Sequence, residues 1–248
     1  MKILVCISHV PDTTSKINFT NNNTAFDTNG VQFVINPYDE FGLTRALWIK
    51  EKQGGSVTVA NVGTSVTEPT IRKALAIGAD DAIRIDADPT DAFFVAKQLA
   101  ALVQENNYDI VICGQESIDY NGGQVPGMMA ALLNWPFVNG CTGLELEGNS
   151  ATVTRDIDGG KETSKTELPA VIAGKKGLVE EKDLRIPNMR GIMTARTKPL
   201  TVRPAVEASK QTNILNFDKP ASKAAVKLID KENVAELVRL LHEEAKVI

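Results

Sequence analysis

Short apolar runs that resemble β-strands alternate with helical patterns through the first half of the chain. This alternation restricts the possible folds more than any other feature. The apolar, β-branched runs occupy residues 3–7, 57–62, 82–85 and 110–113. Apolar residues at helical spacing fill the segments between and after them, at 38–53, 68–76, 90–105 and 128–133. Strands that alternate with helices predict a parallel sheet with helices on both faces, so we expect an α/β, Rossmann-like fold.

Three additions to this α/β unit are expected. Residues 12–35 carry alternating apolar residues around Asn and Gly turns, which predicts a hairpin inserted between the first strand and the first helix. A second β-rich patch follows the α/β part, with strands expected at 142–146, 151–156 and 161–168. The turn at 156–160 makes the last two a hairpin, and residues 168–173 predict one more buried strand. Residues 174–221 have little periodicity and predict an extended arm.

The chain ends in an amphipathic helix, expected over residues 230–245 with Asp230 as its N-cap. Its apolar residues share one helical face: Val234, Leu237, Val238, Leu241 and Ala245. This face either packs on its own domain or, at the end of an extended arm, grips another subunit. Periodicity does not distinguish these two alternatives.

Composition excludes several classes of protein. The chain has 248 residues, a formal net charge of −4 and a pI of about 5.4, which argues against nucleic-acid binding. No apolar run approaches the roughly 20 residues of a membrane helix, so no membrane insertion is expected. The N-terminal MKILVCISHV lacks the apolar stretch of a signal peptide, which indicates a cytoplasmic protein. Cys6, Cys113 and Cys141 form no C-x-x-C pair, so neither a disulfide nor a metal centre is expected.

The segment between the fourth strand and the next helix, residues 114–127, carries the strongest chemical signal. Gly122 and Gly123 permit backbone conformations closed to other residues, so successive amides can point inward as a nest for an anion. The N-terminus of the following helix adds its dipole, and ligands bind beyond the carboxyl ends of parallel strands. The sequence favours phosphate binding here, with an ordinary long connection as the alternative.

The start of the first helix also lies at this edge of the sheet. Asn36 suits the N-cap and Pro37 the first helical position, so capping explains both residues. Tyr38 and Asp39 are then placed near the glycine loop. His9, just past the first strand, is interpreted as a structural histidine. No nucleophile elbow, acid–base pair or cluster of metal ligands is marked, so we expect no catalytic residues.

Four motifs occur in an order that is typical of one family. They are INPYDEF at 35–41, TIRKALAIGAD at 70–80, CGQESID at 113–119 followed by NWP, and VTRDIDGGKETSKTELPAVIA at 153–173. With these motifs the chain resembles the beta subunit of electron-transfer flavoproteins over almost its full length. Ser164 departs from the last motif, where an aliphatic residue is usual. The resemblance implies an α/β fold of the adenine nucleotide alpha hydrolase-like type, in a subunit that forms a heterodimer with an alpha subunit.

The resemblance also implies two cofactors. In this family the alpha subunit holds most of a redox-active FAD, and the beta subunit buries one structural AMP. The residues that correspond to the AMP pocket are Cys6, Asn36, Pro37, Tyr38, Asp39, Val62, Gly114, Gln115, Glu116, Ser117, Ile118, Asp119, Tyr120, Asn121, Gly122, Gly123, Gln124 and Val125. The last three would lie nearest the phosphate. Thr13 and Tyr38 correspond to positions that approach the flavin from the beta side.

The resemblance divides the chain into an AMP-binding domain at 1–176, a recognition loop at 177–199 and an arm with a helix at 200–248 that contacts the alpha subunit. Within the loop, alignment through Arg185, Ile192 and Met193 places Met189 at the anchor position that docks on dehydrogenases. Flavin dehydrogenases, such as acyl-CoA dehydrogenases, would supply electrons, and a quinone oxidoreductase or another acceptor would receive them. The chain itself would be an electron carrier subunit and not an enzyme.

Two other functions remain open, and a third is disfavoured. A flavin-bifurcating relative would hold a second FAD in place of AMP. A stand-alone adenine-nucleotide sensor would be a stable monomer. An ATP-cleaving enzyme of the same broad fold would need an S-G-G-x-D-S loop after the first strand, which SHVPD at 8–12 does not supply.

Overall fold

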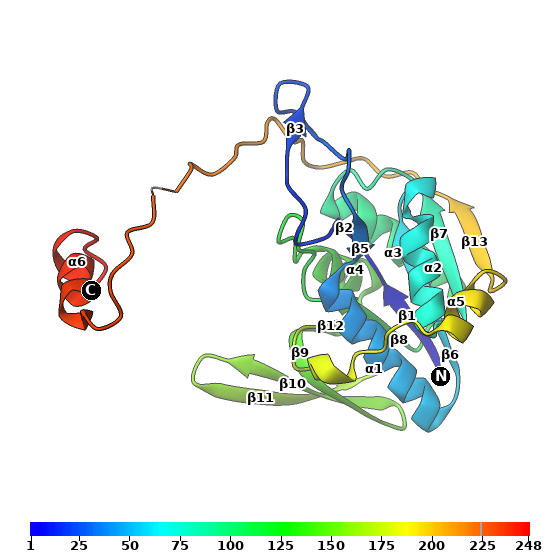
Figure 1. The fold of residues 1–248 in the computed structure, drawn as a ribbon. Coiled ribbons are helices and arrows are strands. Elements are labelled where there is room, and N and C mark those ends of the chain that lie inside the picture. The colour runs from blue at the N-terminus through cyan, green and yellow to red at the C-terminus, as the bar shows by residue number, and fades with distance from the viewer. Residues whose placement is uncertain (224) are drawn as a thin grey trace.

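A sheet of nine strands forms the centre of the computed structural model, which describes residues 1–223 and 225–248 (Figure 1). Across the described residues its order is β11-β10-β9-β12-β8-β1-β6-β7-β13. The strands are β1 (Lys2–Cys6), β6 (Ser56–Val62), β7 (Asp81–Asp86), β8 (Ile110–Gly114), β9 (Phe137–Glu147), β10 (Ser150–Ile157), β11 (Gly160–Glu167), β12 (Ala170–Gly174) and β13 (Leu200–Pro204). The run from β12 to β13 is parallel, which confirms the expected α/β fold.

Helices cover both faces of this sheet. Helices α1 (Pro37–Gln53) and α2 (Glu68–Ile77) pack on one face, and α3 (Ala92–Asn106) and α4 (Val125–Leu133) on the other. Successive residues of a strand point to opposite faces. In β1, Ile3 and Val5 therefore pack under the first pair of helices, and Leu4 and Cys6 under the second. Burial on both sides explains why the strands are continuous apolar runs.

The β-rich patch expected after residue 141 is part of the same sheet. The beginning of β9 pairs in parallel with β12, and the rest of β9 pairs antiparallel with β10. Strand β10 then pairs with β11 in the expected hairpin, whose turn contains Gly159 at φ +85°. The sheet is therefore mixed, because an antiparallel hairpin extends one edge of the parallel core (Figure 1).

The hairpin expected at residues 12–35 is present. Strand β2 (His9–Pro11) pairs with β5 (Phe33–Ile35), and β3 (Phe19–Thr20) pairs with β4 (Ala25–Phe26). Its tip consists of three asparagines, Asn21, Asn22 and Asn23, at φ 51°, 55° and 63°. Asparagine tolerates this left-handed conformation better than other non-glycine residues do.

The prediction of an unpatterned arm over 174–221 was wrong for its first half. This segment forms a short 3-10 turn (Glu181–Asp183), helix α5 (Met189–Ala195) and strand β13, which pairs with β7. Helix α5 lies against α2 so closely that a Cβ at Gly191 would overlap the carbonyl oxygen of Ala76. Such short elements depend on tertiary contacts more than on local propensity, so periodicity did not reveal them.

The arm after β13 ends in helix α6 (Val234–Glu243), which stands apart from the sheet (Figure 1). The helix begins later than predicted, because the side chain of Asn233, not Asp230, accepts the capping hydrogen bond from the amide of Glu236. Val234, Leu237 and Val238 are exposed, so this face does not pack on its own domain in the structure. No helix among residues 1–223 and 225–248 is long and apolar enough to cross a bilayer.

Candidate functional site

The candidate site lies where the direction of chain progression across the sheet reverses. From β1 the chain passes through α1 to β6 on one side, and it later returns through α3 to β8 on the other side of β1. These two crossover helices cover opposite faces. The crevice at the carboxyl ends of two such strands is the usual ligand site of an open α/β sheet. Cys6 ends β1, Val62 ends β6 and Gly114 ends β8, so the structure brings these predicted site residues to one edge.

The start of α1 is held at this edge of the sheet by two polar side chains. Asp39 accepts hydrogen bonds from the amide of Ser8, at 2.7 Å to Oδ2, and from the amide of Gly114, at 2.8 Å to Oδ1. Asn36 donates from Nδ2 to the carbonyl oxygen of Glu116 at 2.8 Å, and its Oδ1 accepts from the amide of Ile118 at 3.2 Å. Asn36 is 1% and Asp39 4% exposed.

These contacts correct the capping interpretation of Asn36. Asn36 does occupy the N-cap position and Pro37 the first helical position, but the Asn36 side chain makes no capping hydrogen bond. Its amide group instead bonds the loop that follows β8, some 80 residues away in sequence. The residue therefore serves the predicted binding loop and not the helix end.

Burial raises the pKa of Asp39 to about 7, against the opposing effect of hydrogen bonds from Ser8, Asn36 and Gly114. The charge of Asp119 raises this pKa further. A carboxyl group with such a pKa changes its protonation state near neutral pH.

Gly114 has a packing role. A Cβ at this position would overlap the Oδ1 atom of Asp39 and lie 2.7 Å from the Cβ of Tyr38. Only glycine lets the chain leaving β8 pass this close to the first turn of α1.

The loop at 115–125 is built differently from the expected nest. Ser117 and Gly122 exchange two backbone hydrogen bonds, of 3.1 and 3.2 Å, and the left-handed residue between them is Asn121 at φ 49°. Gly122 and Gly123 do not adopt left-handed conformations, so the reason given for a nest was wrong. The amides of Gly123, Gln124 and Val125 donate to no acceptor in the described part of the chain, and they lie at the N-terminus of α4. Anion-binding capacity therefore rests on this helix N-terminus.

Other predicted residues lie in or beside this loop, except Thr13, which lies in the turn after β2. Tyr38 is half-buried, and its pKa is raised by burial and then by the nearby carboxylate of Glu116. Gln115 donates its backbone amide to the carbonyl oxygen of Gly174, which ties the loop to β12. Tyr120 and Thr13 are exposed.

The residues predicted to dock on partners gather on and beside α5. Met189 and Met193 are 76% and 69% exposed, and Ile192 is exposed beside them. Ile186, which the sequence did not single out, joins them at 80% exposure. We call Ile186, Met189, Ile192 and Met193 the α5 patch.

The base of the α5 patch is fastened to the domain. The Arg185 guanidinium bonds both carboxylate oxygens of Glu51, at 2.9 and 2.8 Å, so Arg185 holds the segment to α1. At the other end, Lys198 Nζ donates to the carbonyl oxygens of Leu75 and Ala79. The patch therefore combines exposed apolar side chains with a fixed backbone.

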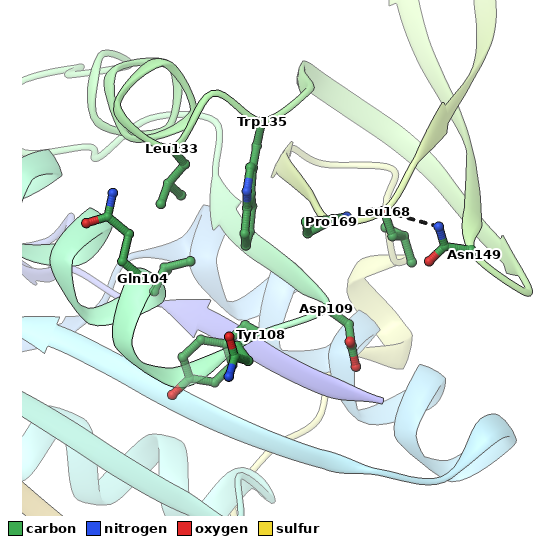
Figure 2. Close-up of a pocket in the computed structure, with 10 residues that line it drawn as sticks. Gln104, Tyr108, Asp109, Leu133, Trp135, Asn149, Leu168 and Pro169 are labelled. Carbon is green, nitrogen blue, oxygen red and sulfur yellow. Dashed lines mark hydrogen bonds between the residues drawn. The ribbon is translucent and has the colours of Figure 1, made fainter.

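A cavity of about 330 Å³ lies at the opposite edge of the sheet (Figure 2). Its lining residues are Val103, Gln104, Asn107, Tyr108, Asp109, Leu133, Trp135, Asn149, Leu168 and Pro169. In Figure 2 the Trp135 ring stands between Leu133 and Pro169. Asp109 directly precedes β8 and Pro169 precedes β12, so this cavity faces the amino ends of the strands. Ligands of open α/β sheets bind at the other edge, so the strand ends beside Asp39 remain the candidate site.

Titratable side chains offer little for catalysis. The thiols of Cys6, Cys113 and Cys141 are buried, and burial raises the pKa of Cys141 to about 12. His9 stacks on Phe33 with centroids 4.3 Å apart and lies 2.8 Å from Thr70 Oγ1, in agreement with a structural role. Among the residues that the structure describes, no three His, Cys, Asp or Glu side chains gather as metal ligands.

These features define a doubly wound α/β protein with a loop and a helix N-terminus at the switch point and a separate, exposed apolar patch. A family model described as "Electron transfer flavoprotein domain" matches residues 23–208. The chain belongs to the electron transfer flavoprotein family, as a member of its beta subunits, which confirms the resemblance seen in the sequence.

Similar proteins from distant organisms carry the same name, "Electron transfer flavoprotein subunit beta". The protein of Syntrophomonas wolfei is 36% identical over 237 residues, which cover 94% of this chain and 92% of the relative. That of Bacillus subtilis is 34% identical over 262 residues, with both chains covered completely. The human protein is 32% identical over 257 residues, which cover 100% of this chain and 99% of the relative.

Proposed function

We propose that this chain is one half of a heterodimeric electron carrier, in which an alpha subunit holds most of an FAD. The designation "subunit beta" of its relatives supports a partner chain. The exposed apolar face of α6, at the end of an arm that leaves the domain, offers a surface for that partner. FAD would supply the redox chemistry by accepting and releasing electrons, and the present chain would make and break no bonds. We place this carrier in the cytoplasm.

The crevice beside Asp39 is proposed to hold a structural AMP. The observation that carries this proposal is the group of amides at Gly123, Gln124 and Val125, which have no acceptor in the described chain and lie at a helix N-terminus. Such amides suit a phosphate group without a lysine. Cys6 and Val62 would contribute apolar contacts at the strand ends.

Tyr38 and Thr13 are proposed to face the flavin. Tyr38 lies in the first turn of α1, and Thr13 lies in the exposed turn after β2. Their role would be to shape the environment of the flavin ring, since a phenol and an aliphatic hydroxyl can contact the ring without reacting with it.

The α5 patch is proposed to dock flavin dehydrogenases, including acyl-CoA dehydrogenases, before the electrons pass to a quinone oxidoreductase or another acceptor. A carrier must leave each partner after transfer, which requires a small and weak interface. Met189 suits this use because a flexible, polarizable side chain fills pockets of different shape. The hydrogen bonds of Arg185 and Lys198 hold the backbone of the α5 patch in place, so its apolar side chains stay exposed in the absence of a partner.

The decisive experiment is native mass spectrometry of the chain co-expressed with its neighbouring genes. The expected species contains one copy of each subunit, one FAD and one AMP. Two flavins in place of one flavin and one AMP would identify a bifurcating carrier. A stable monomer, or a complex without any adenine nucleotide in this subunit, would overturn the proposal.

A further inference from the structure

The Asp39 carboxylate occupies the gap between two neighbouring strands of the sheet. The ladder between β1 and β8 ends at the pair Val5 and Ile112. Beyond it, the amide of Ile7 bonds β6, and Gly114 pairs with β12. The two strands thus part at the carboxyl edge. Asp39 bridges them through the amides of Ser8 and Gly114, at 2.7 and 2.8 Å.

Asn36 continues the same set of contacts along the loop. Together, Asn36 and Asp39 bond the backbone of Gly114, Glu116 and Ile118, which are alternate residues of one segment. The first turn of α1 therefore fixes the base of the loop. The amides proposed to bind phosphate lie at the far end of the same loop, at residues 123–125.

The hydrogen bonds of Asp39 argue against direct contact with the nucleotide. Both carboxylate oxygens of Asp39 are instead engaged by main-chain amides of the protein, and the side chain is buried. Its position at the base of the loop suits a residue that supports the binding site, while other residues contact the ligand.

We propose that Asp39 is a positioning residue, which holds loop 114–125 in the conformation that presents the amides of Gly123, Gln124 and Val125 to the phosphate of the bound nucleotide. This inference rests on the proposed function. It changes the role of Asp39 from a residue that contacts AMP to one that supports the loop that contacts AMP. It predicts that Asp39 affects phosphate recognition more than recognition of the nucleoside.

The test compares Asp39→Asn with wild type in the purified heterodimer. Asparagine has nearly the same shape but only one acceptor oxygen. Its NH2 group would face one of the two backbone amides from which Asp39 accepts a hydrogen bond, so that hydrogen bond is lost. Loss of one hydrogen bond to a charged group corresponds to about a tenfold change in affinity. Glu40→Gln is the matched control, because Glu40 lies in the same helical turn but pairs with Lys73 at 2.8 Å, away from the loop.

Nucleotide-free heterodimer is titrated with AMP and, separately, with adenosine. Asp39→Asn should weaken AMP binding about tenfold and adenosine binding less than twofold, while Glu40→Gln changes neither. Equal weakening of both ligands would show a general loss of structure and overturn the positioning role. Wild-type protein that fails to bind AMP would instead reject the proposed function.

Hydrogen exchange without nucleotide provides a second measurement that does not depend on AMP. The amides of loop 114–125 should exchange faster in Asp39→Asn than in wild type, with unchanged exchange in the core strands. Unchanged loop exchange would overturn the inference whatever the ligand is. If Asp39→Asn does not fold, Asn36→Asp tests the same support of the loop, because it places a second acceptor oxygen against the Glu116 carbonyl oxygen, so the loop amides should again exchange faster.

Discussion

The ring of Phe217 stacks on the ring of Phe19, with centroids 4.8 Å apart and planes 8° from parallel. The backbone reinforces this contact, since the amide of Phe217 donates to the carbonyl oxygen of Asn23 at 2.7 Å. Nearer β13, Gln98 exchanges two hydrogen bonds with the backbone of Val206. The first part of the arm is thus fastened to its own domain, and the inserted hairpin provides the last of these attachments before α6.

Phe217→Ala should release this part of the arm. An aromatic pair contributes about 0.5–1.5 kcal/mol beyond burial, so the arm should open while the sheet remains intact. Limited trypsin digestion followed by mass spectrometry should show faster cleavage after Lys210 at an unchanged melting temperature. Leu215→Ala is the control, because Leu215 is exposed and stacks on nothing. Equal cleavage of wild type and Phe217→Ala would contradict this assignment.

Asp39 should make stability depend on pH. Its pKa is about 7 in the folded protein against an ordinary value of 3.8, so the folded state binds more protons between these values. The free energy of unfolding must then fall as pH rises from about 4 to 7, by up to about 1.4 kcal/mol per pH unit, and level off above the folded pKa. Urea unfolding of wild type and Asp39→Asn between pH 4 and pH 7 measures this dependence. The difference in the free energy of unfolding between wild type and Asp39→Asn should change with pH by this slope. A difference that stays constant from pH 4 to 7 would contradict the raised pKa of Asp39.

Met189→Ala should weaken acceptance of electrons from a dehydrogenase. Met189 is 76% exposed, so its truncation should leave the fold and the flavin spectrum unchanged. Loss of an anchoring side chain at an interface corresponds to about a tenfold rise in the apparent KM for the carrier. Steady-state titration of a dehydrogenase with the carrier measures this value. Val66→Ala, at another exposed apolar residue outside the α5 patch, is the control, and an unchanged KM for Met189→Ala would remove Met189 as anchor.

Leu237→Asp should weaken association with the alpha subunit. If the exposed face of α6 is buried in the heterodimer, one leucine contributes about 1.5–3 kcal/mol, which corresponds to tenfold weaker association or more. The melting temperature of the isolated chain should not change, since Leu237 is exposed there. Analytical ultracentrifugation of the mixed subunits measures the effect. Ala235→Asp introduces the same charge off the apolar face, and similar affinities of the two variants would argue against this interface.

Local patterns predicted the elements that are long and amphipathic or that contain a strong turn. The strands from β1 to β8, helices α1 to α3 and the hairpins at both insertions agree with the sequence to within a few residues. Helix α5 and strand β13 escaped prediction, because seven and five residues carry too little periodicity and the contacts of Gly191 and Lys198 stabilise them.

The site shows the same division. The sequence by itself determined which apolar runs form the buried strands, that a loop follows β8 at the ligand-binding edge, and that the last helix has an apolar face. Only the tertiary structure decided that Asn36 and Asp39 support the loop, that Asn121 takes the left-handed conformation, and that the amides at 123–125 have no acceptor among the described residues. The hydrogen bonds responsible join residues 75 to 82 positions apart, and their geometry exists only after the sheet has brought the ends of β1 and β8 together.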